Sequence, residues 1–566
     1  MRRKGIPVIV ALVLIVIVAV VGFGSRLLEK YSYSKEVVDL DEYYGVEEGE
    51  LAILLQNDMI SDRAYVRDGR IYFELNTVKT YLNEGFYADR NEQKILYTTA
   101  RDTATAVFGA REYTDGAGGH ALEYEACFAE GDGIFLAADY VKRFTNYSWL
   151  AFERHLQVYT EWGTKQTMEV TKDTQVRLEG GIKSPILREA EAGETVEVLE
   201  QGEDWSLVKT SDSVIGYLEN KRLDNLQTVT EEPVRDYVEE EYTSVRLPQK
   251  VSLGFHSIGG EGGNSTLDAM LADGNCINVI APTWFSLTDN EGNFRSFASA
   301  WYVESAHARG LQVWGVWDNF NYRNETGADV SAYEVLSSTT KRQKLVQDMV
   351  DTSLGLKLDG INIDFEGLKV DCGEHYIQFL KELSVLCRGS GLILSVDNYV
   401  PLNFNDYYRL DIQGKILDYC IIMGYDEHWH GSGDPGSVAS IEYVSKGLDR
   451  TLEQVPAEKV VNALPFYMIL WKTEGTTVTD EYVTLNHLAD FLQSQNIKLQ
   501  WDETTCQNYG EWNSGTALYQ IWAEDEESIA VKLNVMNARN IGGVAVWRLG
   551  YGTPAAWDLI RAYGSL

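Results

Sequence analysis

The strongest constraint on the fold is a regular alternation of strand-like and helical segments from about residue 249 onward. The helical runs include TTKRQKLVQDMVDTSLGL and EHYIQFLKELSVLCRGS. Eight strand-like runs recur: KVSLGFHSI, CINVIAPTWFSL, LQVWGVWDNF, GINIDFEGL, LILSVDNYV, YCIIMGYDEHW, KVVNALPFYMIL and GGVAVWRLGYG. This succession predicts a closed parallel (β/α)8 barrel, the TIM barrel of the α/β class, over residues 249–566. An open doubly wound sheet is the alternative, but no Gly-rich phosphate loop follows the first strand.

A chain of 566 residues is too long for one compact domain, so further domains are expected. The segments before the barrel indeed have different sequence patterns. Residues 30–158 mix short strand-like runs with turns, such as a hairpin at Asp68-Gly69, and predict a small mixed α+β module. Residues 164–228 consist of short strands broken at Gly, Asp and Ser, which predicts an all-β barrel. An acidic stretch at 229–248 is typical of a linker.

The N-terminus carries an uncharged apolar run, GIPVIVALVLIVIVAVVGFG, directly after Arg2, Arg3 and Lys4. The run is about as long as a membrane span requires, and a basic flank stays on the cytoplasmic side. Residues 1–25 are therefore predicted to be a single-pass transmembrane signal-anchor, with the membrane as a partner and the bulk of the chain extracellular, facing the cell wall. A cleaved signal peptide is the alternative, although no A-x-A-like site follows.

The net charge limits the classes of binding partner, and the cysteine spacing indicates the state of the thiols. The formal net charge of −36 argues against nucleic acid, because binding phosphates needs clustered Lys and Arg. Six scattered cysteines without C-x-x-C spacing predict buried free thiols. A bridge such as Cys372 to Cys387 stays open for an exported chain.

The stretch LDGINIDFEGL, residues 358–368, places an amide and two carboxyls on one face of a predicted strand. Apolar residues alternate with Asn362, Asp364 and Glu366, and a period of two is that of a strand. In a barrel this face points inward, with Glu366 nearest the C-terminal mouth, where active sites lie. Two close buried carboxyls cannot both ionise freely, so one pKa is raised. A carboxyl that is protonated near neutral pH suits general acid catalysis.

The run DGINIDFE, from Asp359 to Glu366, resembles the D-G-x-D-x-D-x-E signature of glycoside hydrolase family 18, the chitinase family. Other landmarks of that family fall on later strands: MGYD contains Met423, Tyr425 and Asp426, LPFY contains Tyr467, and GGVAVWRLG contains Trp547. The resemblance covers residues 249–566. The second Asp of the signature is Asn362 here, which is similar to the branch of spore-cortex and other peptidoglycan N-acetylglucosaminidases.

Two segments before the barrel also resemble known modules. GETVEVLEQGEDWSLVKTSDSVIGYLEN is similar to the bacterial SH3-like domain, with Trp205 after a turn and then Gly216-Tyr217. That resemblance implies a small barrel that binds the cell wall. Residues 30–158 resemble the module named from the N-terminus of copper amine oxidases, which implies a spacer or stalk in the cell envelope.

The family resemblance implies a role for each matched residue of the barrel. Glu366 is expected to be the general acid/base, Asp364 to orient the 2-acetamido group of the substrate, and Tyr425 to hydrogen-bond its carbonyl oxygen. The other expected residues are Trp547 as the floor under the −1 sugar, Asp426, Tyr467, Asn362, Met423 and Phe255 in substrate binding, and Asp359 as support for the start of the strand.

The implied activity is hydrolysis of β-1,4 bonds in N-acetylhexosamine polymers by substrate-assisted retaining catalysis, without cofactor or metal. Peptidoglycan is the expected substrate, and chitin or an N-linked glycan is the alternative. A non-catalytic glycan-binding wall protein on the same barrel is a different class, although such proteins typically lose the acid and Glu366 is present. His428 and His430 in DEHWH suggest a metal site, with a solvated loop as the competing interpretation.

Overall fold

The computed structural model describes residues 6–239, 241–274 and 276–565. The chain forms two compact units. One unit holds the residues up to Phe86 together with Ala106–Tyr113 and His120–Glu239, and the other holds Tyr87–Thr105, Thr114–Gly119 and the chain from 241 onward. Two short segments of the predicted module at 30–158 thus belong to the unit that contains the barrel.

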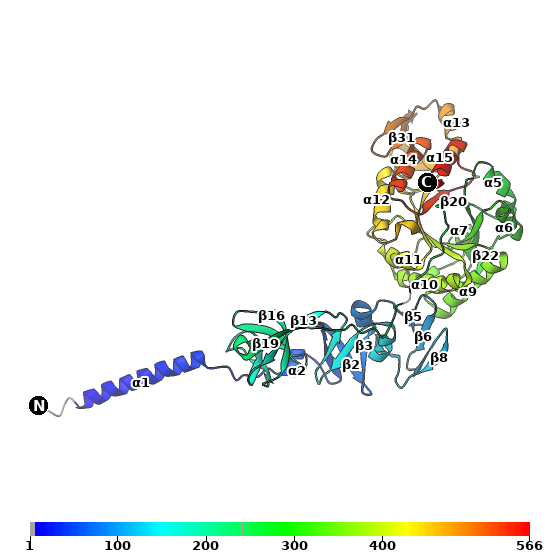
Figure 1. Ribbon diagram of the computed structural model, residues 1–566. Helices are drawn as coiled ribbons and strands as arrows, with labels where there is room; N and C mark the ends of the chain where they lie inside the picture. The colour runs from blue at the N-terminus through cyan, green and yellow to red at the C-terminus, as the bar shows by residue number, and fades with distance from the viewer. Residues whose placement is uncertain (1–5, 240, 275, 566) are drawn as a thin grey trace. The chain divides into compact units, whose positions relative to one another are not determined.

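A ring of eight parallel strands lies at the centre of the second unit (Figure 1). In chain order these strands are β20 (Val251–His256), β21 (Val279–Leu287), β23 (Gln312–Asp318), β24 (Gly360–Asp364), β25 (Ile393–Tyr399), β26 (Tyr419–Met423), β27 (Val460–Pro465) and β33 (Gly543–Trp547). Strand β20 pairs with both β33 and β21, so the ring is closed and the open-sheet alternative is excluded. The predicted (β/α)8 barrel is confirmed. Every residue of β24 is buried, as expected for a parallel strand covered on both faces.

Helices surround the ring (Figure 1). They are α5 (Leu267–Asp273), α6 (Ala300–His307), α7 (Asn321–Thr326), α8 (Ala332–Leu336), α9 (Thr339–Leu356), α10 (Gly373–Ser390), α11 (Leu410–Ile416), α12 (Ile441–Leu452), α14 (Glu526–Ala538) and α15 (Pro554–Gly564). Local chemistry sets their ends. Helix α9 begins after Ser338, whose hydroxyl accepts a hydrogen bond from Lys341 N. Helix α10 ends at Gly391, which has the positive φ of +71° that favours glycine at this position.

An insertion between β27 and β33 forms a separate five-stranded sheet. It contains β28 (Tyr467–Glu474), β29 (Thr477–Thr484), α13 (Leu485–Gln495), β30 (Gln500–Asp502), β31 (Gln507–Ser514) and β32 (Ala517–Ala523). The run KVVNALPFYMIL, predicted as one strand, is divided at Phe466 between the barrel and this sheet. Tyr467 therefore begins the insertion instead of lying on barrel strand seven. The run is apolar throughout, so its composition does not mark the break.

Two seven-stranded sheets form most of the first unit. The first contains β1 (Glu50–Leu55), β2 (Asp58–Arg67), β3 (Arg70–Glu74), β9 (Cys127–Glu130), β10 (Gly133–Ala137), β11 (Ser148–Ala151) and β12 (His155–Tyr159). The second contains β13 (Thr164–Val170), β14 (Thr174–Arg177), β15 (Ile186–Ala190), β16 (Thr195–Gln201), β17 (Trp205–Lys209), β18 (Ile215–Glu219) and β19 (Leu223–Thr230), which confirms the predicted all-β SH3-like fold. Asp68 and Gly69, with φ of +50° and +72°, form the predicted hairpin turn between β2 and β3.

The N-terminal apolar run lies in helix α1 (Ile6–Tyr31), while its basic flank from Arg2 to Lys4 falls outside the described residues. A span needs about 20 consecutive apolar residues. None of the helices in the described part of the chain is long and apolar enough to cross a bilayer. The predicted transmembrane signal-anchor, the membrane as a partner and the single-pass membrane location are therefore wrong.

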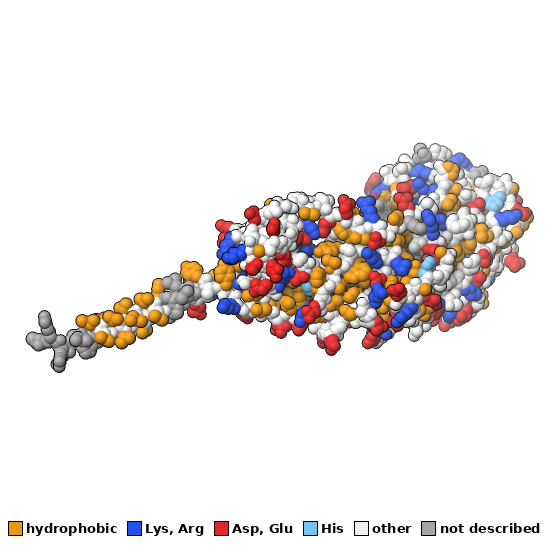
Figure 2. All heavy atoms as spheres, turned by 60° about the horizontal axis from the view of Figure 1, so that its bottom comes forward, with side chains coloured by type: hydrophobic (Ala, Val, Ile, Leu, Met, Phe, Trp, Pro, Cys, Tyr) orange, Lys and Arg blue, Asp and Glu red, His pale blue; other side chains and the backbone are white. Residues whose placement is uncertain are grey.

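The prediction of buried free thiols holds for four cysteines, whereas Cys276 and Cys506 are only partly buried. All six cysteines are free thiols, and Cys372 and Cys387 form no bridge although both are buried. On the face shown in Figure 2, acidic side chains are spread over the surface among the basic ones. Such a dispersed distribution is consistent with a net charge of −36 and with a well-hydrated surface.

Candidate active site

A cavity of about 380 Å³ opens at the C-terminal ends of the barrel strands. Eight of the ten predicted site residues line it: Phe255, Asp364, Glu366, Met423, Tyr425, Asp426, Tyr467 and Trp547. They follow or end different strands, because the C-terminal ends of parallel strands meet at one rim. The volume lies in the range of cavities that hold small ligands. The fold therefore brings residues that are distant in sequence to one place.

Asp364 ends β24 and is buried, whereas Glu366 lies just beyond the strand and is half-buried. Burial raises the pKa of Asp364 well above its usual range, and the nearby carboxyls of Glu366 and Asp397 raise it further. Burial also raises the pKa of Glu366, while a hydrogen bond from Tyr399 opposes that shift. The interaction between the two carboxyls raises the pKa of Asp364 and lowers that of Glu366, so it favours the proton on Asp364. The pair can thus hold a proton near neutral pH and pass it to a bound group.

Neighbouring strands fix the position of Glu366. The Tyr399 hydroxyl donates to Glu366 Oε2 at 2.8 Å. The Asn319 side chain accepts from Glu366 N at 2.8 Å and donates to Glu366 O at 2.9 Å. The side chain and the peptide of Glu366 are therefore held by residues from β25 and from the end of β23, so the carboxyl faces the cavity in a defined orientation.

Aromatic and polar side chains form the rest of the wall. The Tyr467 hydroxyl donates to Asp426 Oδ1, and the Tyr425 and Tyr467 rings pack edge to face with centroids 6.1 Å apart. Trp547 packs against Phe255 with ring centroids 5.5 Å apart. Burial raises the pKa of Asp426, and the hydrogen bond from Tyr467 lowers it. Apolar rings and hydrogen-bonding groups thus line the same cavity, as is typical of sites for small ligands.

Two predicted residues lie outside the cavity. Asn362 is buried beneath Asp364 on β24, and its Nδ2 donates to Ser395 Oγ at 3.0 Å and to Asp397 Oδ1 at 3.1 Å. Asp359 lies before β24, where its Oδ2 accepts a hydrogen bond of 2.8 Å from Val313 N. Both residues contact the framework of the barrel instead of the cavity.

Sequence reasoning missed several residues of the cavity wall. Asp318 accepts from Ser286 Oγ at 2.6 Å and from the backbone N of Asn321 at 2.8 Å, and it turns the chain after β23. Asp397 and Tyr399 reach the cavity from β25. A partial signal existed for these two, because Ser395, Asp397 and Tyr399 share one face of a strand, although Asn398 interrupts the alternation that INIDFE shows.

The sequence suggests His428 and His430 as candidates for a metal site. Within the described ranges, no group of three or more His, Cys, Asp and Glu side chains is arranged to hold a metal ion. His428 Nδ1 lies 2.9 Å from Asp434 O, and His430 Nδ1 contacts Asp480 Oδ1. The two histidines therefore bind different partners, Asp434 in a loop and Asp480 on β29.

Comparison with known families gives the class of this barrel. Residues 326–552 match the model "Glycosyl hydrolases family 18", and residues 172–224 match "Bacterial SH3 domain". The chain thus contains a glycoside hydrolase domain of family 18, preceded by a bacterial SH3 domain.

Individual relatives share part of the chain. The "Cortical fragment-lytic enzyme" of Bacillus anthracis is 26% identical over 237 residues, which are 40% of this chain and 54% of that protein. The "Uncharacterized glycosylase YvbX" of Bacillus subtilis (strain 168) is 25% identical over 296 residues, which are 50% of this chain and 84% of that protein. The chain thus spans about half of the first of these relatives.

A solved structure shares the fold. The spore cortex-lytic enzyme SleL of Bacillus cereus has a TM-score of 0.50 and 21% identity, and the match covers 60% of this chain and 77% of that one. At this identity the likeness concerns the fold alone.

Proposed function

We propose that the barrel hydrolyses β-1,4 bonds in N-acetylhexosamine polymers and retains the anomeric configuration with help from the 2-acetamido group of the substrate. The observation that carries the proposal is the placement of Asp364 and Glu366 at the end of one strand, facing one cavity. Ordinary retaining glycosidases place two carboxyls about 5–5.5 Å apart across the bond, and one of them is the nucleophile. Two carboxyls from one strand approach the bond from one side, so the nucleophile comes from the substrate.

The reaction then proceeds in two balanced steps. Glu366 donates its proton to the glycosidic oxygen, the bond from that oxygen to C1 breaks, and the acetamido carbonyl oxygen bonds to C1. The resulting oxazolinium ion carries a positive charge, which Asp364 and Tyr425 stabilise. Water then attacks C1, its proton passes to Glu366, and the ring of the ion opens. No covalent bond to the protein forms.

The remaining wall residues bind the sugar. Trp547 and Phe255 form the apolar floor of the −1 subsite, and Asp426 and Tyr467 bind hydroxyl groups. Met423 contributes an apolar side chain to the wall. Asn362 and Asp359 act from below by holding the strand.

Peptidoglycan is the substrate that we propose. Support comes from the similarity to a protein named cortical fragment-lytic enzyme, from the bacterial SH3 domain, and from Asn362 in the signature. The SH3 domain would hold the barrel at the cell wall, with the segment at 30–158 as a spacer. Chitin oligosaccharides are the competing substrate class, and binding without cleavage is the competing function.

The test compares purified peptidoglycan with N-acetylglucosamine oligosaccharides, using the full chain. We expect muropeptide fragments with new reducing ends by mass spectrometry and retained configuration in an NMR time course. An oligosaccharide with a free 2-amine at the −1 sugar has no acetamido oxygen, so it should resist cleavage. Inversion at C1, or a sugar trapped covalently on Asp or Glu, would disprove the mechanism. Binding without any cleavage would favour the non-catalytic function.

A further inference from the structure

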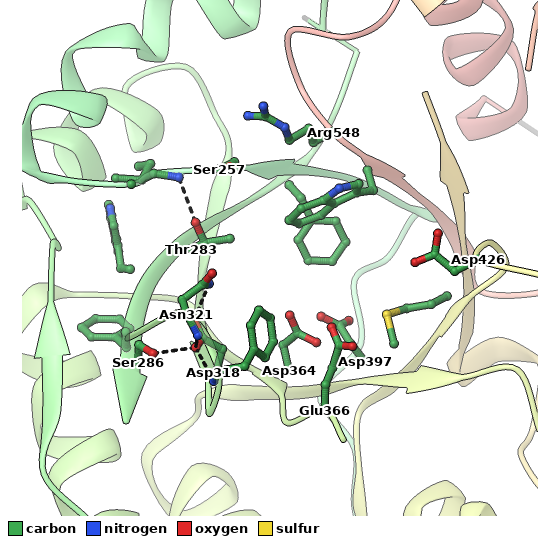
Figure 3. Close-up of a pocket in the computed structure, with 18 of the residues that line it drawn as sticks. Ser257, Thr283, Ser286, Asp318, Asn321, Asp364, Glu366, Asp397, Asp426 and Arg548 are labelled. Carbon is green, nitrogen blue, oxygen red and sulfur yellow. Dashed lines mark hydrogen bonds between the residues drawn. The ribbon is translucent and has the colours of Figure 1, made fainter. Parts of the chain in front are cut away.

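Strand β25 carries a second polar face beside that of β24. The two strands are parallel, with Asn362 opposite Ser395 and Ile363 opposite Val396. The next step of this register brings Asp397 beside Asp364. Figure 3 shows Asp364, Glu366 and Asp397 grouped at one edge of the cavity. A third carboxyl thus joins the two that the signature contains.

Asp397 is held by the residue at which the signature departs from its family pattern. Asn362 Nδ2 donates to Asp397 Oδ1 at 3.1 Å, and its other proton points to Ser395 Oγ at 3.0 Å. Asp397 is 5% exposed and Asp364 is 8% exposed. Two side-chain oxygens, Oδ1 of Asn362 and Oδ1 of Asp364, are buried without a hydrogen-bond partner. Unpaired acceptors two residues apart on one face are suited to share a proton carried by Asp364.

Burying the cluster of Asp364, Glu366 and Asp397 costs folding free energy, because all three side chains are acidic. Burial raises the pKa of Asp397 to about 8, the Asn362 amide lowers it and the charge of Glu366 raises it. No cation among the described residues contributes to that shift or forms an ion pair with Asp397. The titratable groups that face the cluster are Glu366 beyond β24, Asp318 on β23, Asp426 and Tyr425 after β26, Tyr399 on β25 and Tyr376 on α10. A buried acid without a cation destabilises the fold, so a functional gain is needed to offset it.

We propose that Asp397 is a positioning residue for the hydrolysis proposed above: through Asn362 it supplies, from β25, the carboxyl that the signature lacks on β24. Asp397 fixes the Asn362 amide so that its carbonyl oxygen remains available to Asp364. Its charge also couples to Asp364 and Glu366, so the three carboxyls titrate as one group. Asp364 is thereby kept protonated at rest. When substrate binds, its side chain becomes free to contact the acetamido group.

The first test is Asp397→Asn, which keeps an acceptor for Asn362 and removes the charge. We expect kcat to fall about 10- to 100-fold with KM nearly unchanged, because a displaced reacting group loses rate more than binding. Asp397 becomes charged as the pH approaches its pKa of about 8, so on the basic limb the loss of this like charge lowers the pKa values of Asp364 and Glu366. The basic limb of the kcat/KM profile should therefore move to lower pH by about 0.5–1 unit.

The double variant Asn362→Asp/Asp397→Asn exchanges the two groups and restores one carboxyl and one amide. It should recover most of the lost kcat and return the basic limb toward its original position. Ser395→Ala is the matched control, since it removes the other partner of Asn362 without a change of charge, and it should leave the pH profile in place. Wild-type kinetics in Asp397→Asn, or a double variant no more active than that single one, would overturn the proposal.

A readout without substrate separates this proposal from the proposed function. A carboxyl with a raised pKa in the folded state favours folding below its unfolded pKa, and this contribution is lost as pH rises toward its folded pKa. The wild-type melting temperature should therefore fall between about pH 4 and pH 8 more steeply than that of Asp397→Asn. Parallel melting curves would overturn the inference. An inactive wild-type chain whose curves still diverge would instead reject the hydrolysis.

Discussion

Asp364 and Glu366 are two residues apart, yet their surroundings assign them different tasks. Asp364 is enclosed by other acids and retains its proton, because burial and neighbouring carboxyls raise its pKa. Glu366 reaches the cavity, where burial raises its pKa and so allows it to carry a proton, while the hydrogen bond from Tyr399 limits that rise. Both pKa values are raised, that of Asp364 well above its usual range, and such unequal surroundings are how carboxyls in one site are given different roles.

At the residue scale, Glu366→Gln should lower kcat by about 10² to 10⁴, the usual contribution of a general acid, with oligosaccharide binding retained. Gln keeps the size of the side chain but has no acidic proton to give to the leaving oxygen. Steady-state kinetics and calorimetric binding measure the two quantities. Asp371→Asn is the control, an exposed acid between β24 and α10. An equal loss in both variants would contradict the assignment of Glu366.

Tyr399→Phe tests the hydrogen bond that tunes Glu366. The Tyr399 hydroxyl stabilises the ionised carboxylate and so lowers the pKa of Glu366 against the effect of burial. Its removal should raise that pKa, and the basic limb of the kcat/KM profile should move to higher pH by about one unit. This shift is opposite in sign to that expected for Asp397→Asn. A shift to lower pH in Tyr399→Phe would show that the hydroxyl does not donate to Glu366.

The proximity of Asp364 and Glu366 could be predicted from sequence because both carboxyls lie in one segment and follow the period of a strand. Asp397 and Tyr399 lie as close to the reaction, yet their proximity depends on the register between β24 and β25. Alternation shows which side chains share a face, but it does not show which residue of the next strand lies opposite. Register is a property of the closed barrel, so these contacts required the structure.

At the scale of elements, the barrel itself followed from eight β–α units, whereas the insertion between β27 and β33 did not. The boundary at Phe466 is hidden in a continuous apolar run, and the alternating strands of the insertion resemble ordinary surface strands.

The contact between α9 and α10 could not be predicted from the sequence either. Arg342 is 0% exposed and forms a two-point ion pair with Glu382, with distances of 3.1 Å and 2.9 Å. Neither helix shows by its own pattern that these charges meet.

Glu382→Leu should destabilise the fold by about 3–5 kcal/mol, because it leaves the Arg342 guanidinium buried without its carboxylate. The double variant Arg342→Met/Glu382→Leu removes both charges and should lose much less. Urea unfolding of the three chains gives the free energies of unfolding. A double variant as unstable as the single one would mean that packing volume, and not the unpaired charge, causes the loss. Activity is not expected to change at temperatures where each variant is folded.

At the scale of the whole molecule, the second unit includes a segment from far upstream of the barrel. Residues of Tyr87–Thr105 contact the start of α9, where backbone N–H groups lack partners within the helix. Asp89 Oδ2 accepts from both N and Oγ1 of Thr339 at 2.6 Å. Glu92 Oε1 accepts from Thr340 N at 2.7 Å. These carboxylates satisfy N–H groups and lie at the positive end of the helix dipole.

A chain that begins at residue 241 therefore lacks part of its own second unit. It should melt at least about 5 °C below the full chain, because each lost cap costs about 0.5–2 kcal/mol and other contacts vanish with it. Those contacts include Gln378 Nε2 to Thr98 Oγ1 at 2.8 Å. In the full chain, Asp89→Ala should reproduce part of the loss, since α9 keeps Glu92 and Ser338. Calorimetry compares the three chains. If the truncated chain melts with the full one, residues 87–105 only rest on the barrel; if it melts lower, the barrel of this chain needs the upstream segment to complete α9.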